Sequence, residues 1–245
     1  MKMKKKKDLS ILKDLTIAHR GLHNDKLPEN SLGAFKAALE KNIPIEVDIH
    51  LLKSGEVVIF HDDNLKRMTG VNKNINELTY NEIKKLKLLY TDEKIPLLEE
   101  ALQLVDGKVL LDIEFKCTNR AGKLEKAACG LLDYYKGDFI VKSFNPLSLL
   151  WFKINRPNFI RGQISCGFNK EKMNFFKKYI LRNMCMNLIT KPDFVAYDLN
   201  SITEKIVKRL KRKNIPLILW TIRSDEDLKK AKKYGSSVIY EKIIM

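Results

Sequence analysis

Long apolar runs are missing from this chain of 245 residues. No stretch reaches the roughly 18 consecutive apolar residues that a membrane-spanning helix needs. Residues 1–8 have the positive charge of the first part of a signal peptide, but residues 9–14 break the apolar segment that such a signal needs next. We therefore expect neither export nor insertion into a membrane.

Closely spaced cysteines are missing as well. The chain has four cysteines, which stand far apart at Cys117, Cys129, Cys166 and Cys185. Zinc sites use cysteine pairs a few residues apart, and disulfide frameworks use many cysteines in a short chain. The spacing argues against both kinds of site and suits a reducing compartment, so we expect a cytoplasmic protein.

Acidic residues are in short supply. The chain has 30 Asp and Glu against 46 Lys and Arg, which gives a formal net charge of +16 and a pI near 9.6. Such a charge attracts phosphate esters, anionic lipid headgroups and nucleic acid alike, although a preference for lysine on the surface explains it equally well. Because no helix-turn-helix, zinc-finger or RNA-binding motif accompanies the charge, we do not expect nucleic acid as a partner.

The sequence is rich in short apolar strands that alternate with amphipathic helices. After a basic N-terminal segment, residues 1–14, the pattern predicts eight such strands. They are expected near residues 15–19, 45–51, 108–115, 139–144, 159–165, 194–198, 216–221 and 238–241. A returning strand at 56–60 lies in an insertion of about residues 53–75 after the second strand.

This alternation predicts a fold. Alternating strands and helices imply a parallel sheet, and eight such units in about 230 residues imply a single (β/α)8 TIM barrel over residues 15–245. An open, doubly wound sheet is the alternative. The glycine-rich phosphate loop typical of many such sheets does not follow the first strand, so we favour the barrel.

Carboxylates stand two residues apart in the second expected strand. Glu46 and Asp48 share one face of that strand, where they repel each other unless a cation lies between them. The third expected strand places Glu114 and Lys116 on one face in the same way. Hard cations such as Ca²⁺ and Mg²⁺ prefer carboxylate oxygens, so the pattern predicts a metal site.

Histidines follow two other apolar strands. His19 and Arg20 come after the first strand, and His61 comes after the strand at 56–60. Buried strands end in such residues where something binds them. Because the active site of a barrel lies at the C-terminal ends of its strands, these residues and the carboxylates together predict a metal-assisted acid/base site.

Five ordered motifs resemble the glycerophosphodiester phosphodiesterase family. They are His19-Arg20-Gly21, Pro28-Glu29-Asn30-Ser31, Glu46-Val47-Asp48, His61-Asp62 and Glu114-Phe115-Lys116. The later segments 142–146 and 219–221 fit the same family, so the resemblance covers nearly the whole chain from about Thr16. A single His-Arg-Gly would mean little, whereas five motifs in this order are specific.

The resemblance implies an activity and roles for residues. Family members are (β/α)8 barrels with a small insertion after the second strand, and they hydrolyse glycerophosphodiesters to sn-glycerol 3-phosphate and an alcohol with one divalent cation, usually Ca²⁺ or Mg²⁺. Carried over by motif, Glu46, Asp48 and Glu114 would be the metal ligands. His19 and His61 would be the acid/base pair.

Further residues are expected to contact the substrate. The resemblance implies that Arg20 and Lys116 contact the phosphate, and that Glu29 supports the metal site or orients a ligand. Trp220, in the seventh expected strand, is expected to line the substrate pocket. The other two histidines, His23 and His50, are expected to be bystanders.

One pair departs from the family pattern. Many members end the eighth strand in Thr-Asp, whereas this chain has Tyr240-Glu241. We expect this change either to alter the support that the eighth strand gives to the barrel mouth or to mark a subfamily with a different preference for the alcohol. It does not touch the motifs expected to bind the metal or transfer protons.

Two other functions compete with this one. The first is a lysophospholipase D-type phosphodiesterase that releases lysophosphatidic acid from lysophospholipids. The second is a catalytically silent barrel that only binds phospholipid or a protein partner. The intact histidines and carboxylates argue against the silent barrel, because nothing physical keeps such charged groups together without a ligand.

A helix is expected over about residues 170–189. Residues 167–191 carry six basic side chains against one acid, Glu171, among many aromatic and aliphatic side chains. Together with five lysines in residues 2–7, this composition suggests peripheral contact with an anionic membrane. We favour the alternative, an ordinary barrel helix whose apolar stripe faces the strands.

Overall fold

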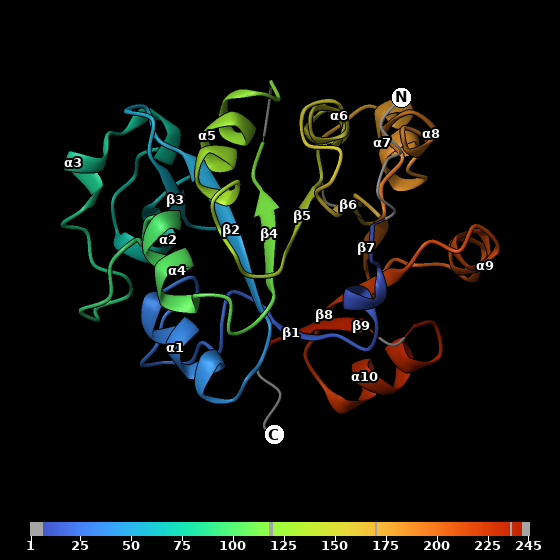
Figure 1. Ribbon diagram of the computed structural model, residues 1–245, viewed down its shortest axis with the longest axis horizontal. Coiled ribbons are helices and arrows are strands. Elements are labelled where there is room, and N and C mark those ends of the chain that lie inside the picture. The colour runs from blue at the N-terminus through green and yellow to red at the C-terminus, as the bar shows by residue number, and fades with distance from the viewer. Residues whose placement is uncertain (1–6, 118–119, 170, 236, 242–245) are drawn as a thin grey trace. The chain divides into compact units, whose positions relative to one another are not determined.

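The computed structural model describes residues 7–117, 120–169, 171–235 and 237–241. Most of the lysines of the predicted segment 1–14 therefore lie outside the described residues. The chain divides into two compact units, one of Ile17–Phe139 and one of Met1–Thr16 with Ile140–Met245. Each unit is built on parallel strands with helices between them (Figure 1).

The unit Ile17–Phe139 is built around one buried strand. Its strands are β1 (Thr16–Ala18), β2 (Ile45–Leu51), β3 (Val57–Ile59) and β4 (Leu111–Phe115). β4 runs parallel to β2, side by side with it in Figure 1, and pairs Asp48 with Glu114. β1 pairs in parallel with the start of β2, and β3 pairs antiparallel with its end.

Helices and a long connection complete this unit. The helices are α1 (Leu32–Glu40), α2 (Lys66–Thr69), α3 (Tyr80–Ile83), α4 (Leu98–Val105) and α5 (Lys123–Leu132), with a 3₁₀ turn at Ile75–Glu77. The connection between β3 and α4 packs over a hydrophobic cluster of its own, which includes Phe60, Leu65 and Met68. This cluster explains how a segment with little regular structure is held in place.

The other unit is a run of five parallel strands. They are β5 (Phe139–Ser143), β6 (Arg161–Ser165), β7 (Phe194–Asp198), β8 (Leu217–Ile222) and β9 (Ser237–Tyr240). Neighbouring strands pair in chain order. The helices are α6 (Pro146–Asn155), α7 (Phe175–Arg182), α8 (Asn187–Thr190), α9 (Glu204–Arg212) and α10 (Asp225–Lys232), and a 3₁₀ turn lies at Ser10–Leu12.

The predicted fold class is confirmed. The eight parallel strands fall at the predicted places, β3 is the expected returning strand, and the strand order is that of a (β/α)8 barrel. Among the residues that the structure describes, no helix combines the length and the apolar character needed to cross a bilayer.

The helix predicted over about 170–189 is wrong in its extent. The segment forms two short helices, α7 and α8, because the Asn174 side chain caps the start of α7 and Met184 takes a left-handed conformation with φ of 53° before α8. The favoured packing of its apolar stripe holds only in part, since Met184 is buried and Ile180 and Leu181 are half-buried. No residue of α7 is buried, and Phe175 and Phe176 are exposed.

Candidate active site

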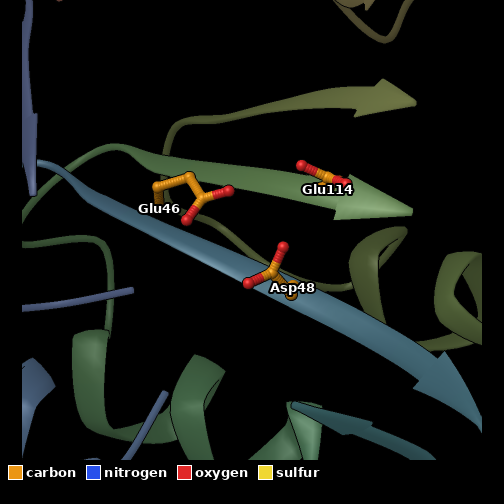
Figure 2. A group of neighbouring side chains, drawn as sticks. All are labelled: Glu46, Asp48 and Glu114. Atoms are coloured by element: carbon orange, nitrogen blue, oxygen red, sulfur yellow. The ribbon is translucent and has the colours of Figure 1, made fainter. Parts of the chain in front are cut away.

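Three carboxylates meet on two neighbouring strands. Glu46 and Asp48 project from the same face of β2, and Glu114 projects from β4, where it is in register with Asp48 (Figure 2). All three side chains are buried, and each offers an oxygen that lies within 4.8 Å of those of the other two. The predicted ligand set is therefore brought together.

The chemistry of this set fits a hard divalent cation. Carboxylates as close as these repel one another, and burial makes the charged form more costly still. Ca²⁺ and Mg²⁺ are bound by oxygen ligands of this kind. In the described part of the chain, one group of carboxylate, histidine or cysteine side chains meets this geometry. It consists of Glu46, Asp48 and Glu114.

Lys116 lies directly against the carboxylates. Its Nζ is 2.9 Å from Asp48 Oδ1 and 2.5 Å from Glu114 Oε1. Burial opposes the charge of Lys116, but the two carboxylates outweigh burial and raise the pKa of Lys116 above its usual range. For Asp48, burial is likewise outweighed, and the charges of Lys116 and His61 hold the pKa of Asp48 well below its usual range.

Arg20 reaches two of the acids by different atoms. Its backbone N–H donates to Glu46 Oε2 at 3.1 Å, and its side-chain Nε is 3.3 Å from Asp48 Oδ2. The backbone turns sharply here, with φ of 57° at Arg20 and 81° at Gly21. A Cβ at position 21 would lie 2.9 Å from the backbone carbon of Ala34, so the turn after Arg20 requires glycine.

Asn30 holds Asp48 from both sides of its amide. Its Nδ2 donates to Asp48 Oδ2 at 2.9 Å, and its Oδ1 accepts from the Asp48 backbone N–H at 3.4 Å. The residue is buried in a left-handed conformation that asparagine tolerates better than most residues. Asn30 belongs to one of the five motifs, but its contact with Asp48 was not predicted, because an amide alone does not indicate its partner.

His61 follows β3 and is held by Asp62. The distance from His61 Nδ1 to Asp62 Oδ1 is 2.6 Å, and His50 Nε2 lies 3.3 Å from the His61 carbonyl oxygen. The backbone N–H of Phe60 donates to the carbonyl of Asp48 at 2.9 Å, which ties this segment to β2. His19 follows β1, and both its charge and that of His61 lower the pKa of Asp48.

Arg67 was not predicted, and it joins two parts of this site. Its Nε donates to Asp62 Oδ2 at 2.6 Å, and its Nη2 donates to Glu29 Oε1 at 2.6 Å. Glu29 in turn accepts from Arg20 Nη1 at 2.7 Å. A continuous network thus runs from Arg20 through Glu29, Arg67 and Asp62 to His61.

Two predicted features belong to the other unit. Trp220 lies on β8 and packs edge to face against Phe144, with 5.8 Å between the ring centroids. Tyr240 is buried on β9, and Glu241 accepts from Arg223 Nε at 2.8 Å. The pocket role of Trp220 and the effect of the Tyr240-Glu241 pair stay predictions.

Comparison with known proteins gives a consistent result. The sequence model described as the glycerophosphoryl diester phosphodiesterase family matches residues 19–243. A glycerophosphodiester phosphodiesterase of Caldanaerobacter subterraneus is 30% identical over 238 residues, which cover 91% of this chain and 92% of that protein. A human lysophospholipase D is 26% identical over 255 residues, which cover 90% of this chain and 81% of that protein.

Solved structures share the fold. A phosphodiesterase of Oleispira antarctica, in complex with the product sn-glycerol-3-phosphate, aligns with a TM-score of 0.78 at 23% identity and covers 92% of each chain. A glycerophosphodiester phosphodiesterase of Thermotoga maritima aligns with a TM-score of 0.69 at 26% identity and covers 92% of this chain and 94% of that chain.

Proposed function

The chain belongs to the glycerophosphoryl diester phosphodiesterase family and is an enzyme of that kind. We propose that it hydrolyses glycerophosphodiesters to sn-glycerol 3-phosphate and an alcohol, using one divalent cation and two histidines. The observation that supports this proposal most is the buried cluster of Glu46, Asp48 and Glu114 on β2 and β4. Cationic and imidazole groups surround the cluster, as the hydrolysis of a phosphodiester requires.

We assign the three carboxylates to a cation, Ca²⁺ or Mg²⁺. When bound, such an ion offsets the negative charge of the phosphodiester and of its transition state. Arg20 and Lys116 lie against the same carboxylates and would contact the phosphate oxygens. The planar guanidinium of Arg20 suits a two-point contact, whereas the ammonium of Lys116 acts as a point charge. Glu29 would orient Arg20 through their ion pair.

We assign proton transfer to the two histidines. One removes a proton from the attacking oxygen, and the other gives a proton to the departing alcohol. Because Asp62 engages His61 at Nδ1, the Nε2 atom of His61 would exchange the proton. The attacking oxygen is that of water or that of the glycerol 2-hydroxyl, which would form a cyclic phosphate that water then opens.

The test is hydrolysis of glycerophosphocholine, coupled to detection of glycerol 3-phosphate. We expect activity with Ca²⁺ or Mg²⁺, loss of activity with a chelator, and a fall of about 10²–10⁴-fold in kcat for His19→Ala and for His61→Ala. His23→Ala serves as the matched histidine control and should keep its activity. Hydrolysis that survives both the chelator and the loss of either histidine would refute the mechanism.

A second substrate class is favoured by one comparison. The similarity to a human lysophospholipase D extends over 90% of this chain. The same assay with lysophosphatidylcholine, followed by detection of lysophosphatidic acid, tests that class. If the ratio of kcat/KM favours the lysophospholipid over glycerophosphocholine, the enzyme is a lysophospholipase D with the same catalytic residues.

A further inference from the structure

Helix α9 presents a row of basic side chains. Four of them recur at positions i, i+3, i+4 and i+7, which places them on one face of the helix: Lys205, Lys208, Arg209 and Arg212. The opposite face packs inward through Ile206, Val207 and Leu210, which are buried. Packing therefore fixes the orientation of α9 and directs Lys205, Lys208 and Arg212 outward. The half-buried Arg209 donates to the Asn183 carbonyl at 2.9 Å.

Helix α7 presents aromatic rings to the solvent. Phe175 is 83% exposed, Phe176 is 71% exposed and Tyr179 is 54% exposed. In α8, Leu188 and Ile189 are also exposed. Large apolar side chains gathered in this way mark an interaction surface, because a chain gains stability when such groups leave water.

A groove joins the two helices. It has a volume of about 1010 Å³ and is lined by residues of both α7 and α9, among them Phe175 and Tyr179. Its basic lining residues are Lys178, Arg182, Lys205, Lys208, Arg209 and Arg212. The acid in the lining, Glu204, is 3.7 Å from Lys208 and offsets little of this charge. Aromatic rings and a strong positive charge thus occupy one surface.

We propose that this α7–α9 surface, formed by the exposed rings of α7 and the basic residues of the groove, binds an anionic lipid bilayer. Aromatic rings are favoured at the level of the lipid headgroups, and each nearby lysine or arginine adds attraction to an anionic leaflet. A second copy of the chain does not fit, because it would bring two positive surfaces together. The surface would hold the enzyme beside lipids, and its binding does not depend on the proposed hydrolysis.

Vesicle co-sedimentation of the full chain tests the proposal. We expect binding to vesicles of phosphatidylcholine with about one third phosphatidylglycerol, little binding to pure phosphatidylcholine, and weaker binding as salt is raised. Equal binding to both kinds of vesicle, or no binding to either, would overturn the proposal. So would tight binding to a DNA or RNA oligonucleotide in place of anionic vesicles.

Variants separate the two contributions. Lys205→Gln with Arg212→Gln should weaken binding about 30-fold, and Phe175→Ser with Phe176→Ser should weaken it at least about tenfold. Lys229→Gln with Lys230→Gln removes the same charge from α10, and Tyr134→Ser removes an 81% exposed ring elsewhere. These controls should bind as the wild type does. Equal losses in the controls and the surface variants would show a general charge effect and refute the surface.

All six positions substituted in the surface and α10 variants are exposed, so the variants should fold normally. Thermal melting of each variant checks this expectation. Hydrolysis of glycerophosphocholine in solution should be unchanged in the surface variants. Failure of the membrane proposal would therefore leave hydrolysis intact, and failure of the proposed hydrolysis would leave vesicle binding intact.

Discussion

At the scale of single residues, Arg67 connects the two ends of the candidate site. Its guanidinium binds Glu29 and Asp62. Glu29 binds Arg20, and Asp62 binds His61. One side chain from α2 therefore orients both a group assigned to the phosphate and a group assigned to proton transfer.

Removal of Arg67 should slow catalysis more than it weakens substrate binding. We expect Arg67→Ala to lower kcat about 10–100-fold with a smaller change in KM, because supporting residues act through the position of the catalytic groups. Arg67→Lys should restore only part of kcat, since an ammonium lacks the fork that spans two carboxylates. Arg223→Ala, which breaks the exposed ion pair with Glu241, is the control. An unchanged kcat in Arg67→Ala would show that Arg67 does not position the catalytic groups.

Arg67 should also make the free energy of unfolding depend on pH. Burial raises the pKa values of Glu29 and Asp62, but the hydrogen bonds from Arg67 outweigh it, and both pKa values are lowered in the folded protein. The unfolded chain then binds more protons at acidic pH, so the contribution of Arg67 is complete above about pH 5 and declines as pH falls toward 3.

Urea unfolding from pH 7 to pH 3 measures this contribution. Arg67 is about half exposed, so the difference between wild type and Arg67→Ala should be only about 1 kcal/mol at pH 7. It should shrink below pH 5. A difference that grows toward acidic pH would contradict the assigned ion pairs.

Sequence reasoning reached some of these residues and missed others. Glu46 and Asp48 were predicted as a pair because strand periodicity places residues two apart on one face. Asn30 and Arg67 act through partners 18 and 38 residues away, Asp48 and Glu29. No local period encodes such contacts, so they become visible only when the loops around β2 are placed.

At the scale of elements, β6 and β7 fit together only because β6 carries a glycine. A Cβ at Gly162 would lie 2.2 Å from the buried ring of Phe194 on β7. The strands pair in register at these two residues. The ring fills the space that any other residue at position 162 would take.

Gly162→Ala should therefore lower the free energy of unfolding by about 1–3 kcal/mol, because the Phe194 ring must move. Gly130→Ala on α5 is the matched control, since nothing lies within 4 Å of its Cβ position. There the same change should raise stability by about 0.5–1 kcal/mol, because alanine favours the helix. Denaturant unfolding of both variants decides the matter, and effects of equal sign would refute the packing argument.

The strands were predicted more reliably than the segments between them. Most parallel strands are short apolar runs that are buried along most of their length, so their sequence shows their place. β6 is the exception, because it is buried but carries Arg161, Gln163 and Ser165. The connection before α4 gives no such signal, because its helices α2 and α3 have only four residues each. The helix over 170–189 failed because helical periodicity does not reveal a left-handed residue such as Met184.

At the scale of the whole molecule, cation binding should stabilise the fold. A cation that binds the folded chain at 100 times its Kd adds about 2.7 kcal/mol, which for a chain of this size raises Tm by about 5–10 °C. We expect this rise with Ca²⁺ or Mg²⁺, and its loss in Glu114→Gln. Glu204→Gln, which changes an exposed acid on α9, should keep the full rise. Equal shifts in both variants would place the cation elsewhere.

The division at Phe139 and Ile140 has a consequence for inheritance. The three carboxylates, both assigned histidines and the Arg67 network all lie between residues 19 and 116, so recombination between related genes near position 140 would pass them on as one block. Substitutions that accumulate beyond that point, the α7–α9 surface among them, would alter where such an enzyme works while leaving its reaction intact. Descendants of one ancestral barrel would in this way share their reaction and differ in the surface on which they act.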